Sequence, residues 1–434
     1  MVVDKNKLLK ESKTFCMFPW MHIYSNPDGT TWPCCNTEPE VINESLENKT
    51  LEEIFVSEKW NQLRLDMLEG KENPACRKCY AVEKAGGASY RSYANKDFGN
   101  NIDLVDNTLQ DGSLESVQFK YIDIRFSNQC NQACATCGPE FSTYWQKLLI
   151  DNDRFFDKFK KFYRLSNHSK ENIFEQLKPH FPTAQEIYFA GGEPLIMDEH
   201  YQILNHLIDI KANDTVKLRY NSNCSNFYYK KSSVINLWNK FKYVKLGASV
   251  DAVEDVAELI RFGTNFKTLS SNLKEALTCE NLILQYDTVV SVLNIDHLPY
   301  MYDYLLENDL VNQKTWFTLN LAFTPLPFSL TSLIPKYKEK YSKKILDYAD
   351  SLENRKIKNI GTSAKEFLIN QLRAIPNFMY GSDTWEKDEK WYGLHALVGW
   401  TIRDHQAFEN LIPDVYDMAF NIANRYDRNG NRIS

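Results

Sequence analysis

Three cysteines within eight residues constrain this chain more than any other feature of its sequence. Cys130, Cys134 and Cys137 follow the segment 121–127, in which apolar and polar residues alternate as they do in a β-strand. The apolar residues of the next segment, 141–149, are spaced like one face of a helix. We therefore expect the three cysteines on a loop at the C-terminal end of a strand, where α/β folds place their functional sites.

Three thiolates on one loop suit an iron–sulfur cluster. They can bind three irons of a [4Fe-4S] cube and leave the fourth iron open to a ligand that does not come from the protein. A zinc ion would usually recruit a fourth protein ligand. On the spacing of the cysteines alone, a zinc site and three buried thiols remain alternatives.

Composition narrows the class of protein. The chain has 434 residues, enough for two or three domains, with 43% hydrophobic and 25% charged residues, as in a soluble globular protein. Its net charge of −6 gives no overall attraction to nucleic acid or to an anionic membrane. The N-terminus lacks an apolar signal segment, and no apolar run approaches the length of a membrane span. The chain has ten cysteines, most of them in motif clusters, and this favours metal ligation in a reducing cytoplasm over a disulfide framework.

A second group of cysteines lies near the N-terminus. Cys16 and Cys34 flank a Pro-Asp-Gly turn that predicts a β-hairpin, and Cys76 and Cys79 form a Cys-x-x-Cys pair after a leucine-rich helical segment. Together they supply four thiolates, which is a complete ligand set for zinc or for an iron–sulfur cluster. Cys35 is adjacent to Cys34 and is either a spare or the true ligand in its place.

A pair of glycines follows the next predicted strand. Segment 186–190 predicts that strand, and Gly191 and Gly192 permit close approach to the backbone. Glu193 and Pro194 complete a Gly-Gly-Glu-Pro sequence. A Cys-x-x-x-Cys-x-x-Cys loop followed by Gly-Gly-Glu-Pro on the next strand resembles the radical S-adenosylmethionine (SAM) enzymes.

This resemblance implies that the three-cysteine loop holds a [4Fe-4S] cluster whose open iron binds SAM. It implies that the loop of Gly191 and Gly192 binds the SAM amino group, with Glu193 adding charge complementarity. Further SAM-binding positions implied by the resemblance lie at or after the ends of later strands: Asn223, Ser249, Asp251, Arg261, Val292 and Asn294. A strand-end cap remains the alternative for Ser249 and Asp251, and substrate contact or a surface salt bridge remains the alternative for Arg261.

The N-terminal segment resembles the SPASM/twitch domains that hold auxiliary clusters in many radical SAM enzymes. The resemblance rests on the order of hairpin, leucine-rich helix and Cys-x-x-Cys. It implies one auxiliary [4Fe-4S] cluster, because the segment has five cysteines and a full SPASM domain with two clusters has about seven. The implied ligands are Cys16, Cys34, Cys76 and Cys79.

The fold expected from these patterns is α/β. Six predicted strands alternate with helices and predict a partial (β/α)6 barrel: 121–127, 186–190, 216–220, 243–251, 282–294 and 316–321. Helical patterns at 335–352 and 364–372 predict a helical C-terminal region. The expected domains are a small α+β SPASM/twitch-like domain, a linker, the radical SAM partial barrel and the helical region, over residues 1–90, 91–118, 119–328 and 329–434.

The resemblance implies reductive cleavage of SAM to a 5′-deoxyadenosyl radical, which takes hydrogen from a small-molecule or peptide substrate. A four-ligand auxiliary cluster favours net oxidation, with that cluster as electron acceptor. Flavodoxin or ferredoxin is the kind of external one-electron donor implied. Cys224 is a candidate hydrogen donor to the substrate radical, or else a small buried residue. The alternatives are a radical SAM maturase that cross-links or epimerises a ribosomally made peptide, and a non-enzymatic iron–sulfur or zinc scaffold.

Overall fold

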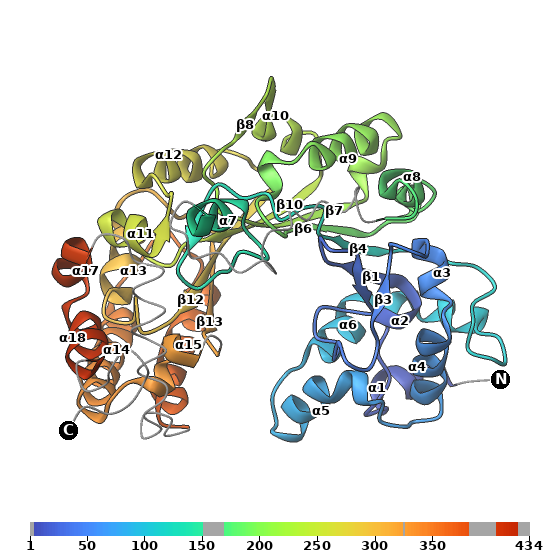
Figure 1. Cartoon of the computed structure of the whole chain (residues 1–434), viewed down its shortest axis with the longest axis horizontal. Coiled ribbons are helices and arrows are strands. Elements are labelled where there is room, and N and C mark those ends of the chain that lie inside the picture. Colours follow the sequence, from blue (N-terminus) through green and yellow to red (C-terminus); the bar gives the residue numbers. More distant parts are fainter. Residues whose placement is uncertain (1–3, 151–168, 324–325, 382–404, 424–434) are drawn as a thin grey trace. The chain divides into compact units, whose positions relative to one another are not determined.

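The structure is a computed structural model that describes residues 4–150, 169–323, 326–381 and 405–423 (Figure 1). Contacts within the chain divide it into two units. The first comprises Met1–Gln129, Lys161–Arg219 and Lys240–Lys242, and the second comprises Cys130–Lys160, Tyr220–Asn239 and Tyr243–Ser434.

The first unit is built on a mixed sheet. Its strands are β1 (His22–Ser25), β2 (Thr30–Trp32), β3 (Glu44–Ser45), β4 (Tyr121–Ile124), β6 (Glu186–Phe189) and the start of β7 (Lys217–Ser222), which continues into the second unit. β4 pairs in parallel with β1 and β6, while β2 pairs antiparallel with β1 and β3. The register aligns Ile23, Ile122 and Ile187, each at most 2% exposed, so one face of the sheet is apolar core.

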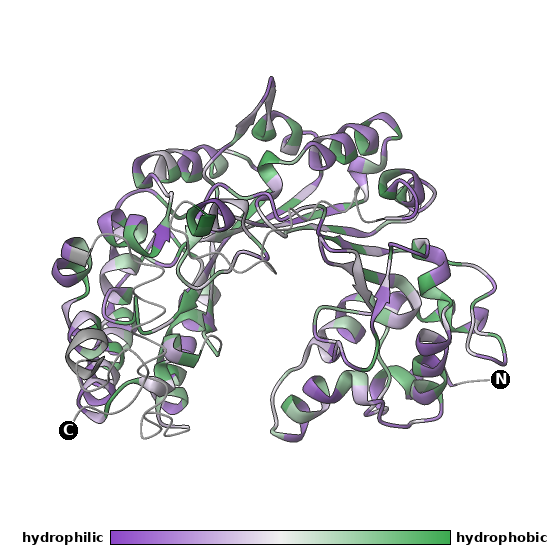
Figure 2. Ribbon diagram, in the orientation of Figure 1, coloured by the Kyte–Doolittle hydropathy of each residue, from purple (hydrophilic) through white to green (hydrophobic). Residues whose placement is uncertain are grey.

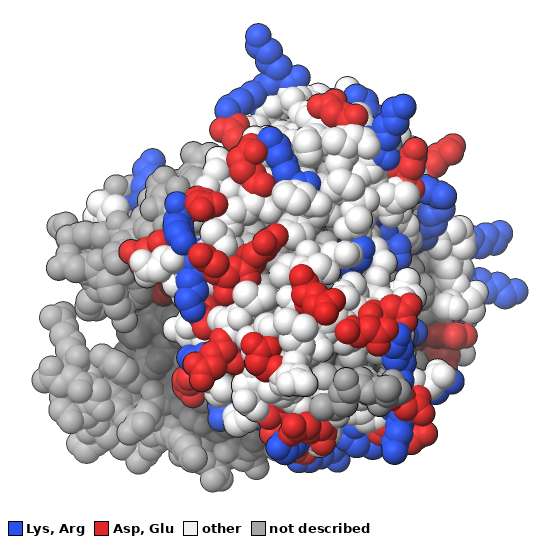
Figure 3. Space-filling model, turned by 90° about the vertical axis from the view of Figure 1, so that its right-hand side faces the viewer, with Lys and Arg blue, Asp and Glu red and all other residues white. Residues whose placement is uncertain are grey.

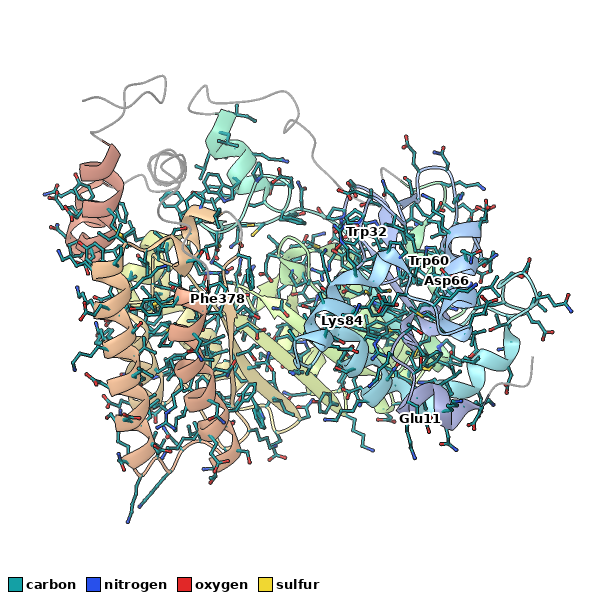
Figure 4. All side chains as sticks on the ribbon, turned by 90° about the horizontal axis from the view of Figure 1, so that it is seen from below. Glu11, Trp32, Trp60, Asp66, Lys84 and Phe378 are labelled. Carbon is teal, nitrogen blue, oxygen red and sulfur yellow. The ribbon has the colours of Figure 1, made fainter. Side chains whose placement is uncertain are left out.

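Short helices pack around this sheet. They are α1 (Lys5–Lys10), α2 (Phe18–Met21), α3 (Leu51–Phe55), α4 (Glu58–Leu68), α5 (Arg77–Lys84), α6 (Tyr90–Phe98), α8 (Ile173–Leu177) and α9 (Asp198–Asp209). Thr50 and Glu53 form a capping box that begins α3. Trp60 of α4, labelled in Figure 4, is fully buried against Phe55. The segment 91–118, expected as a linker, contains most of α6 and a 3₁₀ helix over Gly99–Asn107.

The second unit contains three parallel strands in the order β10 (Tyr243–Ser249), β12 (Leu282–Val290) and β13 (Trp316–Leu321). Val244, Leu246 and Ala248 of β10 are completely buried, and the residues between them point to a more polar face. The accompanying helices are α7 (Thr143–Ile150), α10 (Val234–Trp238), α11 (Glu254–Ile260), α12 (Phe266–Ala276) and α13 (Leu298–Glu307).

Two long helices, α14 (Pro335–Asn354) and α15 (Thr362–Tyr380), confirm the helical patterns predicted after the last strand. Figure 2 shows hydrophilic and hydrophobic residues alternating along them, as expected for helices with one buried face. Gln371 of α15 accepts a hydrogen bond from the Leu319 nitrogen at 2.9 Å and donates one to the Phe317 carbonyl at 3.0 Å. The Gln371 side chain therefore forms hydrogen bonds with backbone groups of β13 that could otherwise pair with another strand.

The structure confirms the predicted α/β class. All six predicted strands are present, as β4, β6, β7, β10, β12 and β13. Two shorter helices, α17 (His405–Leu411) and α18 (Pro413–Ala423), lie in the last part of the chain that is described, and the charged segment 384–391 lies outside it. Across the described ranges, no helix is both long enough and apolar enough to span a membrane.

Candidate functional site

Four cysteine thiols of the first unit act on one another at a site where Cys16 and Cys79 are buried and Cys34 and Cys76 are half-buried. Cys16 lies just before α2, Cys34 follows β2, and Cys76 and Cys79 lie at the start of α5. Burial raises the pKa of Cys16 well above its usual value, and the other three thiols of the group raise it further. Burial and the neighbouring Cys76 raise the pKa of Cys34 to about 12. Burial and the neighbouring Cys79 raise the pKa of Cys76 to about 12.

This donor set fits an iron–sulfur cluster. All four cysteines are free thiols. Deprotonating them in place would bring four negative charges together in a poorly solvated site, which is why burial and the neighbouring thiols raise the pKa values of Cys16, Cys34 and Cys76. Iron ions would supply the compensating positive charge and hold the sulfurs as thiolates.

Adjacent cysteines after β2 have different neighbours. The Cys34 sulfur lies 3.6 Å from the Thr37 hydroxyl oxygen, and its thiol interacts with Cys76 and Cys79. Burial raises the pKa of Cys35 to about 12, and the charged groups that act on it besides Cys34 are Asp123, Arg125 and Arg219. The surroundings therefore favour Cys34 as the ligand and place Cys35 toward charged side chains of β4, β7 and the residue after β4.

The three-cysteine loop belongs to the second unit and is fixed by backbone pairing. Within it, β5 (Ala133–Cys134) pairs antiparallel with β11 (Arg261–Phe262). The Trp145 indole nitrogen donates to the Cys134 carbonyl at 2.9 Å. The Thr143 hydroxyl donates to the Cys130 carbonyl at 3.1 Å and accepts from the Cys130 nitrogen at 3.2 Å. These bonds to α7 and β11 hold two of the cysteines before any cluster binds.

Arg261 is the main positive charge beside this loop. Its guanidinium makes an ion pair with Asp251, with 2.7 Å between Nη1 and Oδ2. Burial lowers the pKa of Arg261, but Cys134 and Asp251 outweigh burial and hold that pKa well above its usual value. Desolvation and the neighbouring Cys134 together raise the pKa of Cys137 to about 12, whereas Arg261 acts to lower it. One cation therefore favours thiolates on the loop.

The turn after β7 also reaches the cysteine loop. The side-chain nitrogen of Asn223 donates to Asn131 Oδ1 at 3.0 Å and lies 3.9 Å from the Cys130 sulfur. Cys224 adopts a positive φ of 52° and is completely buried, with its thiol 3.7 Å from the Ser222 carbonyl. This enclosed thiol matches the alternative of a small buried residue, and hydrogen donation by Cys224 stays a prediction.

The side chains of Asp251 and Asn294 form hydrogen bonds to backbone groups near the ends of β10 and β12. The Asp251 carboxylate accepts from the Val289 nitrogen at 2.8 Å, and the Asn294 amide donates to the Asp251 carbonyl at 2.7 Å and to the Val289 carbonyl at 2.9 Å. These bonds fix the ends of β10 and β12. Ser249 is half-buried at the end of β10, and Val292 is buried with its nitrogen bonded to the Phe328 carbonyl at 3.0 Å.

The glycine loop lies against the residues that precede Cys130. Gly192 and Glu193 donate backbone hydrogen bonds to the carbonyls of Ser127 and Gln129, at 3.0 and 2.7 Å. A Cβ atom on Gly192 would clash with the Gln129 carbonyl, and Gly191 has a φ of 122°. The Glu193 carboxylate accepts from the Leu195 nitrogen at 3.1 Å, so it also caps the following turn. Both glycines are required by this close approach.

Sequence reasoning missed a charged cluster on the first unit's sheet. Arg125 makes an ion pair with Asp123 at 2.7 Å, and its guanidinium lies 5.1 Å from the centre of the Tyr188 ring. Arg219 lies 4.8 Å from the centre of the same ring. The alternating polar residues of segments 121–125 and 217–219 could have indicated a polar face on each strand. They do not show that these faces meet at Tyr188, because that depends on which strands pair.

A smaller polar group was missed on the second unit's strands. Asp287 of β12 accepts hydrogen bonds from Asn221 at 3.1 Å and from Gln285 at 2.5 Å. A Cβ atom on Gly247 of β10 would clash with the Asp287 carboxylate, so that glycine makes room for it.

In the part of the chain that is described, no group of three or more His, Cys, Asp or Glu side chains is arranged to hold a single metal ion.

Comparison with known proteins supports an iron–sulfur domain. Residues 16–80 match the SPASM family model, described as an iron–sulfur cluster-binding domain. The match includes Cys16, Cys34, Cys76 and Cys79, and it confirms the predicted SPASM-type character of the N-terminal segment. Together with the three-cysteine loop, this match supports the resemblance to radical SAM enzymes that carry a SPASM-type domain. The comparison with curated proteins found no match.

Several solved structures resemble the chain distantly. One is native anSMEcpe with bound AdoMet and the Cp18Cys peptide, at 18% identity and a TM-score of 0.36, over 54% of this chain and 61% of that one. Another is Streptococcus suis SuiB bound to S-adenosylmethionine, at 12% identity and a TM-score of 0.35, over 78% and 69%. TYW1 with a lysine-pyruvate adduct follows, at 13% identity and a TM-score of 0.28, over 52% and 70%. The chain thus spans about three fifths of the anSMEcpe structure, and no argument rests on likenesses this distant.

Proposed function

We propose that this chain is a radical SAM enzyme that cleaves SAM reductively and takes hydrogen from a small-molecule or peptide substrate in a net oxidation. The observation that carries the proposal is the close seating of the Gly191–Glu193 loop on residues 127–129, directly before Cys130. Within the first unit, the glycine loop therefore lies against the residues that lead into the three-cysteine loop. A zinc or iron scaffold has no need of it.

Cys130, Cys134 and Cys137 would hold a [4Fe-4S] cluster, which would supply an open iron for SAM and pass on the electron needed to break its carbon–sulfur bond. The protein supplies the surroundings. Arg261 places positive charge beside the thiolates, and Asn223 places an amide donor beside the Cys130 sulfur. Gly191 and Gly192 are half-buried and carry no side chains of their own, so we assign their backbone to the amino group of SAM.

The auxiliary site supports the oxidative half of the proposal. Cys16, Cys34, Cys76 and Cys79 are enough to ligate every iron of one cluster, so no position is left for substrate. A cluster held there would exchange electrons and would have no open iron to which a substrate could bind. We assign it as the acceptor of the electron that the substrate radical gives up. Thiols in both groups must stay reduced to bind iron, which favours the cytoplasm.

The test is anaerobic. The protein is reconstituted with iron and sulfide, mixed with SAM and dithionite, and assayed for 5′-deoxyadenosine. We expect the parent to produce it and a Cys130/Cys134/Cys137→Ala variant to produce none. Cys279→Ala is the matched control, because Cys279 is a buried cysteine that neither group includes. A parent with both clusters filled that forms no 5′-deoxyadenosine with any sugar or peptide offered would favour a scaffold.

A further inference from the structure

A short hairpin projects from the second unit directly after the turn at Cys224. It is formed by β8 (Tyr228–Tyr229) and β9 (Ser232–Ser233), which pair antiparallel. The Val234 nitrogen donates to the Phe227 carbonyl at 2.9 Å and closes its base. Strands this short are not stable alone. Phe227 anchors them, because its ring is buried and lies 5.5 Å from the ring of Trp238.

The outer part of the hairpin is basic and aromatic. Lys230 and Lys231 form its exposed tip, and Tyr228 is 61% exposed. The Lys230 ammonium lies 5.2 Å from the centre of the Tyr229 ring, and the Tyr228 hydroxyl donates to Glu275 at 3.2 Å. Figure 3 shows blue side chains projecting at the top of the molecule, where Figure 1 places β8.

The base of the hairpin is bonded to the cysteine loop. The Asn131 side chain donates to the Ser225 hydroxyl at 2.9 Å and accepts from Asn223, whose amide also lies 3.9 Å from the Cys130 sulfur. Lys230 lies five positions after Ser225, a span of at most about 18 Å of extended chain. A protein bound at the tip would therefore be close to the cluster that this loop is proposed to hold.

We propose that this hairpin is the docking site for an acidic one-electron carrier protein of the flavodoxin type, which reduces the cluster held by the three-cysteine loop. The inference rests on the proposed function. Charge complementarity selects the occupant. The chain as a whole carries a net charge of −6, so it repels an acidic partner in general, while Lys230 and Lys231 attract one locally. Exposed tyrosine beside cationic side chains suits the contact itself, because aromatic residues are enriched at protein interfaces.

The test compares two reductants with one readout. Flavodoxin is reduced beforehand and separated from its reductant, and methionine release from SAM is measured under anaerobic conditions. Flavodoxin loses one electron for each SAM whose carbon–sulfur bond breaks. For Lys230→Glu/Lys231→Glu we expect the second-order rate with flavodoxin to fall about tenfold at low ionic strength. The deficit should shrink as salt screens the charges. With dithionite, a small reductant that needs no docking site, the variant should match the parent.

Two further variants make the result specific. Lys230→Arg/Lys231→Arg keeps the charge and should keep the flavodoxin rate. Lys356→Glu/Lys358→Glu changes charge equally on the exposed loop between α14 and α15, and it should leave the flavodoxin rate near the parent's. An unchanged flavodoxin rate in the hairpin variant, or an equal loss with dithionite, would overturn the docking proposal. A parent inactive with dithionite would instead overturn the proposed function beneath it.

Discussion

The two cysteine groups differ in how completely the protein surrounds iron. The first unit gathers four thiols, Cys16, Cys34, Cys76 and Cys79, from three places in the chain. The second unit offers three thiols on a single loop and sets a cation, Arg261, beside them. A four-thiol site closes a cluster, and a three-thiol site leaves one iron open. In the function that we propose, this difference assigns electron exchange to the four-thiol group and SAM chemistry to the three-thiol group.

The largest effect should come from removing one thiol from each group in turn. Cys134→Ala should reduce 5′-deoxyadenosine to background, because the loop cluster is lost. Cys76→Ala should lower iron from about eight to about four per chain but leave 5′-deoxyadenosine formation measurable. Iron analysis and chromatography of the same samples check both. Equal loss of 5′-deoxyadenosine in the two variants would erase the distinction between the groups.

Substitution of Cys34 or of Cys35 tests which of these adjacent cysteines belongs to the four-thiol group. Cys34→Ser should lose about four irons per chain, because Cys34 lies among the other three thiols. Cys35→Ser should keep the parent's iron content, because its charged neighbours besides Cys34 are Asp123, Arg125 and Arg219. Iron analysis after identical reconstitution is the measurement. Loss of iron in Cys35→Ser with retention in Cys34→Ser would reverse the ligand assignment.

Gly192→Ala tests whether the loop site depends on the backbone approach beside it. The added Cβ would clash with the Gln129 carbonyl, one residue before Cys130. Displacing this loop should lower the rate of SAM cleavage about 100-fold with little loss of iron. Gly99→Ala is the control, because its Cβ would meet only the end of the Leu9 side chain, at 3.3 Å. A Gly192→Ala rate equal to that of Gly99→Ala would contradict the close approach.

Arg261→Met removes the cation beside the three-cysteine loop. Arg261 and Asp251 are 12% and 5% exposed in their side chains, so the substitution leaves a buried carboxylate without its ion pair. We expect the free energy of unfolding to fall by about 3 kcal/mol, as measured by urea denaturation of the apoprotein. Arg373→Met breaks a more exposed pair with Glu353 and should change stability little. Equal effects would indicate that Arg261 does not stabilise the loop region.

Local patterns in the sequence predicted much of this molecule, and three-dimensional pairings account for the rest. The six strands and the helices after residue 335 follow from periodicity, and both cysteine groups follow from spacing. The pairing of β5 with β11 and the shared contact of Arg125 and Arg219 with Tyr188 join segments far apart in the chain. No local pattern contains those pairings, because they depend on which strands become neighbours.

The most direct test is electron paramagnetic resonance of the reduced protein with and without SAM. The parent and a Cys16/Cys34/Cys76/Cys79→Ala variant should each show one cluster signal that shifts when SAM is added, because the loop cluster has an open iron. In the Cys130/Cys134/Cys137→Ala variant, the remaining signal should be the same with and without SAM. A SAM-dependent shift in that last variant, or none in the parent, would contradict the division between an open and a closed site.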